Sequence, residues 1–131
     1  MGVLYTNNAS TTLAAGLNNS ATSTTVASSS GFPTISGSNY FYATLELTDG
    51  SAHEIVKVTA ISGVTWTIVR AQDSTSARAF SSSDKVELRI NSALLTDVVN
   101  DALASTFTRQ AFTGDGSDTT FTLSRTVNSE N

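Results

Sequence analysis

The sequence predicts a mainly β fold: a small antiparallel β-sandwich or barrel-like domain, then a short helix and the start of a β shaft. Short runs that alternate apolar and polar residues recur as far as Ile90, and turn residues separate them. A run with helical spacing follows, and a further strand-like pattern begins at Phe107. At 131 residues the chain has room for one domain and an extension. We therefore expect a β domain over residues 1–92, a helix over residues 93–106 and an incomplete shaft module over residues 107–131.

The first third of the chain predicts short strands in a segment without charge. Residues 11–17 and 23–27 are rich in Thr and apolar residues, which favour a pleated, half-buried surface. Residues 28–39 contain Gly and Pro and are expected to form a loop. The first charged residue is Glu46. Such a segment suits burial against other chains, because desolvating an unpaired charge is costly, but it equally suits a plain run of strands and turns.

Three strands with short connections are predicted next. Residues 40–48 alternate apolar and polar side chains, and Asp49-Gly50 is a strong hairpin signal. Residues 54–61 form the return strand, Gly63 turns the chain again, and residues 64–70 form the third strand. The pattern is typical of an antiparallel meander.

Each strand of the meander is expected to bury one face and expose the other. In residues 40–48, Phe41 and Leu45 lie on the face predicted to be buried. Tyr42 and Glu46 lie on the opposite face, which we expect to be in contact with solvent.

The last strand of the β domain is predicted over residues 85–90. Val86, Leu88 and Ile90 point one way, towards the core, and the charged residues between them point to solvent. Interleaved opposite charges discourage edge-to-edge aggregation. Phe80 is the one large apolar side chain in the preceding polar stretch and is expected to fill the edge of the core.

An amphipathic helix is predicted after that strand, with Asn91 or Ser92 as its N-cap. Its apolar stripe, spaced i, i+3, i+4 and i+7, consists of Leu95, Val98, Val99 and Ala102. Isolated helices shorter than about 12–15 residues are marginal in water, so the apolar stripe must be buried. Either the β domain or the same helix in partner chains could bury it. The repeat is too short to identify a coiled coil from its pattern.

The end of the chain is interpreted as two strand halves, over residues 110–124, around a turn at Asp115-Gly116. A single hairpin is marginal in water because it cannot bury its apolar face alone. We therefore expect this segment to belong to a larger assembly, formed by a longer polypeptide, by identical partner chains, or by both.

No catalytic, cofactor-binding or metal-binding residue is predicted, and the chain is not expected to be an enzyme. There is no Cys, and the single His, His53, follows a hairpin turn, where a surface position is expected. Three carboxylates cluster near that hairpin: Glu46, Asp49 and Glu54. We interpret them as part of a solvent-exposed turn, and not as an acid–base site, which would need a cleft. Residues 115–118 supply too few ligands for an EF-hand calcium loop.

Composition argues against two classes of partner. The net charge of −4 and the pI of about 4.6 argue against a nucleic-acid surface, which needs clustered Lys and Arg. No apolar run approaches the roughly 20 residues needed to span a bilayer. Tyr40, Tyr42 and Trp66 lie on predicted strands, where core packing is the default and a carbohydrate-binding face is the alternative.

Two motifs resemble structural proteins of tailed bacteriophages. The first is a module in which Arg-x-Gln is followed by an Asp-Gly-Thr-type turn, an Ala-Arg-Ala-aromatic stretch and a Val-Glu-Leu-Arg strand. Its elements here are Arg70-Ala71-Gln72, Asp73-Ser74-Thr75, Ala77-Arg78-Ala79-Phe80 and Val86-Glu87-Leu88-Arg89, within a resemblance that covers roughly residues 6–95. Ser74 stands where this module usually has glycine. The second, Phe112-Thr113-Gly114-Asp115-Gly116-Ser117 with the Thr120–Leu123 run, resembles the opening of a repeat common in phage tail fibres.

The resemblance implies the proximal, virion-attached part of a tail fibre. Such proteins are usually homotrimers whose N-terminal domains dock to the tail or baseplate and whose distal parts bind the host receptor. The expected location is the virion tail, after synthesis in the bacterial cytoplasm, and the apolar stripe would form the trimer seam. The alternatives are a head fibre or capsid decoration protein, or a carbohydrate-binding β module.

Overall fold

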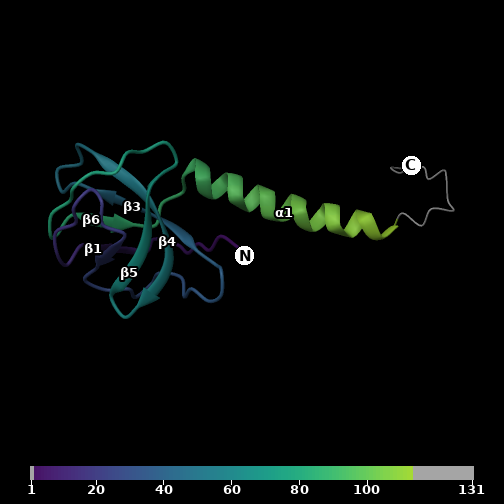
Figure 1. The fold of residues 1–131 in the computed structure, drawn as a ribbon, viewed down its shortest axis with the longest axis horizontal. Coiled ribbons are helices and arrows are strands. Elements are labelled where there is room, and N and C mark those ends of the chain that lie inside the picture. The colour runs from purple at the N-terminus through teal and green to yellow at the C-terminus, as the bar shows by residue number, and fades with distance from the viewer. Residues whose placement is uncertain (1, 114–131) are drawn as a thin grey trace. The chain divides into compact units, whose positions relative to one another are not determined.

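The computed structural model describes residues 2–113, with side chains as far as residue 103. The mainly β class, with a helix after the strands, is confirmed (Figure 1). The elements are β1 (Ser10–Thr12), β2 (Ser23–Thr25), β3 (Phe41–Glu46), β4 (His53–Ser62), β5 (Thr65–Gln72), β6 (Lys85–Glu87) and α1 (Ser92–Thr113). The chain divides into two compact units within α1, and the first, Met1–Val98, contains every one of these strands.

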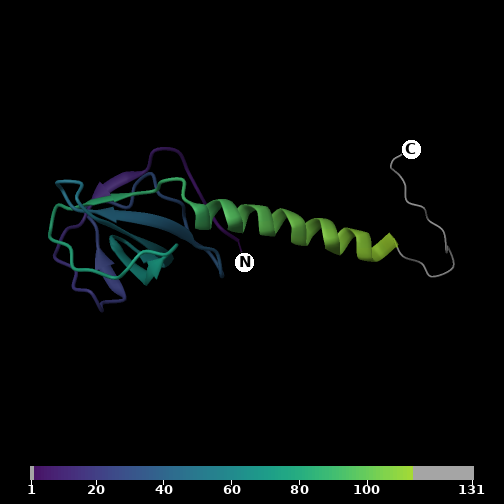
Figure 2. The same ribbon diagram turned by 90° about the horizontal axis from the view of Figure 1, so that it is seen from above.

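The strands form one antiparallel sheet in the order β1-β6-β3-β4-β5-β2. Its two outermost strands also meet, because Leu13 pairs with Val26. The Ala14 N–H donates to the Thr25 carbonyl and the Ala27 N–H to the Thr12 carbonyl, each at 2.8 Å. The sheet therefore curls towards closure (Figure 2). Of the two architectures that the sequence left open, the structure has the barrel-like one.

The predicted meander is present as β3, β4 and β5. The β3–β4 hairpin turns at Asp49-Gly50, where the Gly50 N–H donates to the Leu47 carbonyl at 2.8 Å. Gly50 has φ 76° and Gly63, in the next turn, has φ 64°. Glycine adopts this left-handed backbone without steric cost, which is why these two positions end the strands.

The barrel interior is built around Trp66 and Phe41, both with no exposed surface. Their rings meet edge to face with centroids 5.5 Å apart, and Phe32 approaches the indole to 4.9 Å. The indole Nε1–H donates to the Ser29 hydroxyl at 2.8 Å, so the one polar atom of this ring is paired. Phe80 is also buried, as predicted.

The expectation that one face of residues 40–48 is solvated is wrong. Tyr42 on that face is 6% exposed and Thr44 is 3% exposed. A second apolar cluster covers the outer face of β3 and β4; it consists of Val3, Tyr40, Tyr42, Ile55 and Leu94. The N-terminal segment and the first turn of α1 supply this cover, so β3 is buried on both faces.

The interpretation of Glu54 as part of a solvent-exposed turn is also wrong. Its side chain has no exposed surface and accepts four hydrogen bonds of 2.7–3.0 Å. Two come from the Arg70 guanidinium, one from the Ala71 N–H and one from the Arg78 N–H. Arg70 also donates to the carbonyls of residues 18, 21 and 78, which ties the β1–β2 and β5–β6 connections to one buried ion pair.

We expect this carboxylate to make the fold sensitive to acid. Burial alone would raise the pKa of Glu54, but the hydrogen bonds from Arg70 and from two backbone N–H groups outweigh burial and hold the pKa below its ordinary value of 4.5. A depressed pKa gives stability that is complete above the unfolded-state pKa and is lost as the pH falls through the folded-state pKa. The free energy of unfolding, measured with urea, should therefore be steady near neutral pH and fall below pH 4.5. Glu54→Gln should be less stable at pH 7 and lose less on acidification; an equal loss in both proteins would contradict this role.

The helix begins as predicted and ends later than predicted. Asn91 is the N-cap, since its Oδ1 accepts from the Leu94 N–H at 2.9 Å. The predicted end of the helix at residue 106 is wrong, because α1 runs without a break to Thr113. Residues 107–113, predicted to begin a strand pattern, are therefore helical. No Gly or Pro interrupts residues 92–113, and a nucleated helix propagates at little cost. The rest of the predicted shaft module, residues 114–131, lies outside the described residues.

Candidate functional site

The four residues of the apolar stripe all lie on the exposed surface of α1. Leu95 is 56% exposed, Val98 36% and Val99 54%, and Ala102 is also exposed. The structure adds Leu103, 46% exposed, which the sequence pattern did not include. Helical spacing places Leu95, Val99 and Ala102 along one side of the helix.

Exposed large apolar side chains are concentrated in this part of the chain. Among the described residues there are eight, of which five lie between residues 90 and 103: Ile90, Leu95, Val98, Val99 and Leu103. Ile90 was predicted to point into the core with Val86 and Leu88 but is 78% exposed, because β6 ends at Glu87. Single exposed apolar residues are ordinary, whereas a contiguous group marks an interaction surface. This stretch is the strongest candidate site in the described chain.

The first turns of α1 contact the barrel through Leu94 and Asp97. Leu94 is 5% exposed within the second apolar cluster. One oxygen of Asp97 accepts from the Tyr40 hydroxyl at 2.6 Å and from the Tyr42 hydroxyl at 2.7 Å. Leu95 and Val98, which belong to the same compact unit, remain exposed. The β domain therefore does not bury Leu95 or Val98, which leaves partner chains as the other expected way to bury them.

A second polar contact holds the start of the helix. The Asp73 carboxylate accepts from the Ser92 hydroxyl at 2.5 Å and from the Ser92 N–H at 3.1 Å. These bonds hold the pKa of Asp73 below its ordinary value, so the carboxylate is ionised near neutral pH. A negative charge beside the first turn of a helix is also favoured by the helix dipole.

We expect Asp97→Ala to loosen this attachment. Burial and the Asp97 carboxylate raise the pKa of Tyr42, so its hydroxyl stays protonated and donates. Removal of the carboxylate leaves two largely buried hydroxyls without this acceptor, at a cost of about 1.5–3 kcal/mol for bonds to a charged group. Hydrogen exchange should quicken in residues 94–98, and the urea midpoint should fall. Asp101→Ala removes an exposed carboxylate from the same helix and is the control; equal effects of the two variants would refute the attachment role.

Ser74, at the position where the resemblance leads us to expect glycine, lies in a strained backbone. Ser74 has φ 65°, and Ala71 and Asp73 are also left-handed. A non-glycine residue in this region costs about 1–2 kcal/mol, a cost that glycine avoids. Ser74→Gly should therefore stabilise the fold by about 0.5–1 kcal/mol after the entropy cost of glycine is subtracted. Ser76→Gly, at a nearby exposed position without positive φ, should destabilise it; a thermal melt that ranked them the other way would show that the turn is not strained.

The aromatic platform required by the carbohydrate alternative is not present at the predicted residues. Trp66 has no exposed surface, Tyr40 is 8% exposed and Tyr42 is 6% exposed. A sugar ring stacks only on an accessible aromatic face, and these three faces are occupied by the core and by the second apolar cluster.

The remaining candidate chemistry is sparse in the described chain. No group of three or more His, Cys, Asp or Glu side chains within residues 2–113 could hold a metal ion. His53 is exposed at the start of β4, and the carboxylate of its neighbour Glu54 accepts hydrogen bonds from Arg70 and from two backbone N–H groups. Within the same residues, no helix has the length and apolar character needed to cross a membrane.

Sequence reasoning missed the roles of two carboxylates: Glu54, which is buried with Arg70, and Asp97, which attaches α1 to the barrel. Glu54 carried a signal, since a period of two places it on the buried face with Val56 and Val58. For Asp97 the sequence contained no such signal, apart from its position outside the apolar stripe. No protein-family model matches this chain, and no curated protein matches it.

Proposed function

We propose that this chain is the virion-attachment end of a trimeric bacteriophage tail fibre. The observation that carries the proposal is the exposed apolar stripe on a helix that directly follows a barrel-like domain. The two phage-like motifs support the same assignment, and they supply the expectation of three copies. The barrel docks to the tail or baseplate, and α1 gathers the chains about a common axis.

The barrel and α1 each have features that suit these two roles, docking and association of the chains. The barrel pairs its outermost strands with each other through Leu13 and Val26, so it leaves little free sheet edge for unspecific strand addition. In α1, Leu94 and Asp97 contact the barrel and leave Leu95 and Val98 for other chains. Contact with the host receptor is assigned to distal parts of the fibre.

Fractionation of phage particles tests the proposal against its main alternative. Tails and heads of the phage that encodes the chain are separated, and the chain is quantified in each by mass spectrometry with labelled standard peptides. The proposal expects the chain in the tail fraction, in a copy number that is a multiple of three. Recovery with heads alone would instead identify a head fibre or decoration protein, and absence from both fractions would exclude a virion role.

A further inference from the structure

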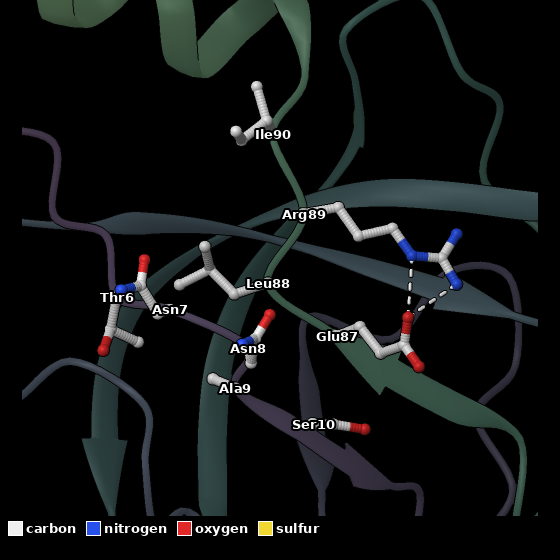
Figure 3. Close-up of a pocket in the computed structure, with 9 residues that line it drawn as sticks. All are labelled: Thr6, Asn7, Asn8, Ala9, Ser10, Glu87, Leu88, Arg89 and Ile90. Atoms are coloured by element: carbon white, nitrogen blue, oxygen red, sulfur yellow. Dashed lines mark hydrogen bonds and ion pairs between the residues drawn. The ribbon is translucent and has the colours of Figure 1, made fainter.

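The barrel carries a hollow of about 530 Å³, a size within the range of about 300–1,000 Å³ typical of ligand sites. Residues 6–10 line one side and residues 87–90 the other, all within the first compact unit (Figure 3). It lies where two paired segments separate. Ser10 and Glu87 are the last pair of the β1–β6 ladder, and the Leu88 N–H still donates to the Ala9 carbonyl at 3.0 Å.

Beyond that bond the two backbones have no hydrogen bonds to each other. Asn8 takes φ 57° and turns the N-terminal segment away, while residues 89 and 90 continue towards α1. Among residues 2–113, the N–H groups of Asn7, Asn8 and Ile90 form no hydrogen bond. These groups are therefore left to water or to an added chain, as at an exposed sheet edge.

The lining selects a neutral ligand. Leu88 and Ala9, 9% and 5% exposed, form an apolar floor, and Asn7 and Asn8 present side-chain amides that both donate and accept. The two charges are already paired, since Arg89 Nε donates to Glu87 Oε1 at 2.8 Å, and Figure 3 shows this pair pointing away from residues 6–8. Arg89 is also paired with Glu46 at 2.7 Å.

We propose that this hollow receives an extended, uncharged peptide segment of the virion protein to which the barrel docks. Separated backbones with free N–H groups match a peptide main chain, which carries alternating donors and acceptors and can add between them as a strand. A sugar would use the same amides, but none of the nine lining residues is aromatic, so no stacking platform is present. The inference rests on the proposed function, because it names the surface through which that function attaches the fibre.

The test fills the hollow and maps what lies in it. Asn7→Trp adds bulk inside the hollow, and Ser51→Trp adds the same bulk at an exposed turn outside it. Each variant is first checked for its thermal melt and its oligomeric mass, and is then quantified in purified phage tails. In parallel, a benzophenone amino acid replaces Asn7, and whole particles are irradiated so that mass spectrometry can identify the cross-linked peptide.

The expected result is that Asn7→Trp folds and keeps its oligomeric mass but is incorporated about tenfold less than Ser51→Trp. The cross-link should join Asn7 to an extended segment of a different tail protein. Equal incorporation of the two variants, or cross-links to this chain alone, would overturn the docking inference while leaving the proposed function intact. Absence of the unmodified chain from tails would overturn both.

Discussion

Replacing Leu95 and Val99 together with Asp is expected to dissociate the proposed trimer into monomers. Burying a Leu or Val side chain contributes about 1.5–3 kcal/mol. Each substitution removes this contribution from three chains at once and places a carboxylate where the trimer would desolvate it. Both side chains are more than half exposed in the single chain, so the monomer fold should be unaffected. Light scattering after size-exclusion chromatography measures the mass, and a thermal melt checks the fold.

The matched control adds the same two charges to another side of the same helix. Thr96 and Asn100 are exposed and share the i, i+4 spacing of Leu95 and Val99, but lie off the apolar stripe. Thr96→Asp with Asn100→Asp should therefore leave the mass unchanged. If both double variants dissociate alike, added charge and not the loss of the stripe is responsible. If neither dissociates, α1 is not the seam between chains.

Replacing Arg70 with Leu is expected to destabilise the fold by about 3–5 kcal/mol, the cost of leaving a buried charge without its partner. Glu54 would keep two backbone hydrogen bonds but lose both bonds from the guanidinium, which are 2.7 and 2.8 Å long. The carbonyls of Asn18, Ala21 and Arg78 would lose their donor as well. A typical domain is stable by only about 5–15 kcal/mol, so this loss is large. Urea unfolding at pH 7 measures it.

Arg89→Leu is the control, because Arg89 also bonds two carboxylates. It pairs with Glu46 and Glu87, both at 2.7 Å, but its side chain is 37% exposed. Exposed ion pairs contribute about 0–1 kcal/mol, so Arg89→Leu should cost far less than Arg70→Leu. Similar costs would mean that burial of Glu54 is not what makes its ion pair important.

Those parts of the fold that depend on local patterns could be predicted from the sequence. The hairpin at Asp49-Gly50 and the buried face of Phe41 and Leu45 follow from turn chemistry and a period of two. The apolar stripe also followed from helical spacing. Its exposure agrees with contact between partner chains but does not test it. The helix end did not follow, because a weak strand pattern from Phe107 competed with a helix that meets no breaker before Gly114.

The contacts that the sequence could not reveal are those between distant segments. Tyr42 looked solvated because alternation describes one face of a strand and does not show what covers the other. Its cover comes from Val3 and from Leu94 and Asp97 of α1, the last of these 55 residues away in the chain. The hollow was equally hidden, since it arises where residues 6–10 and 87–90 separate. Tertiary packing, not local preference, determines each of these features.

In the proposed fibre, copies of this chain associate in threes through the apolar stripe of α1. Sedimentation equilibrium of the unmodified chain over a wide range of concentrations tests it most directly. The proposed function predicts a reversible approach to three times the 13.7 kDa mass of one chain. A mass that stays at 13.7 kDa at every concentration, or that reaches only twice this value, would contradict a trimeric fibre end.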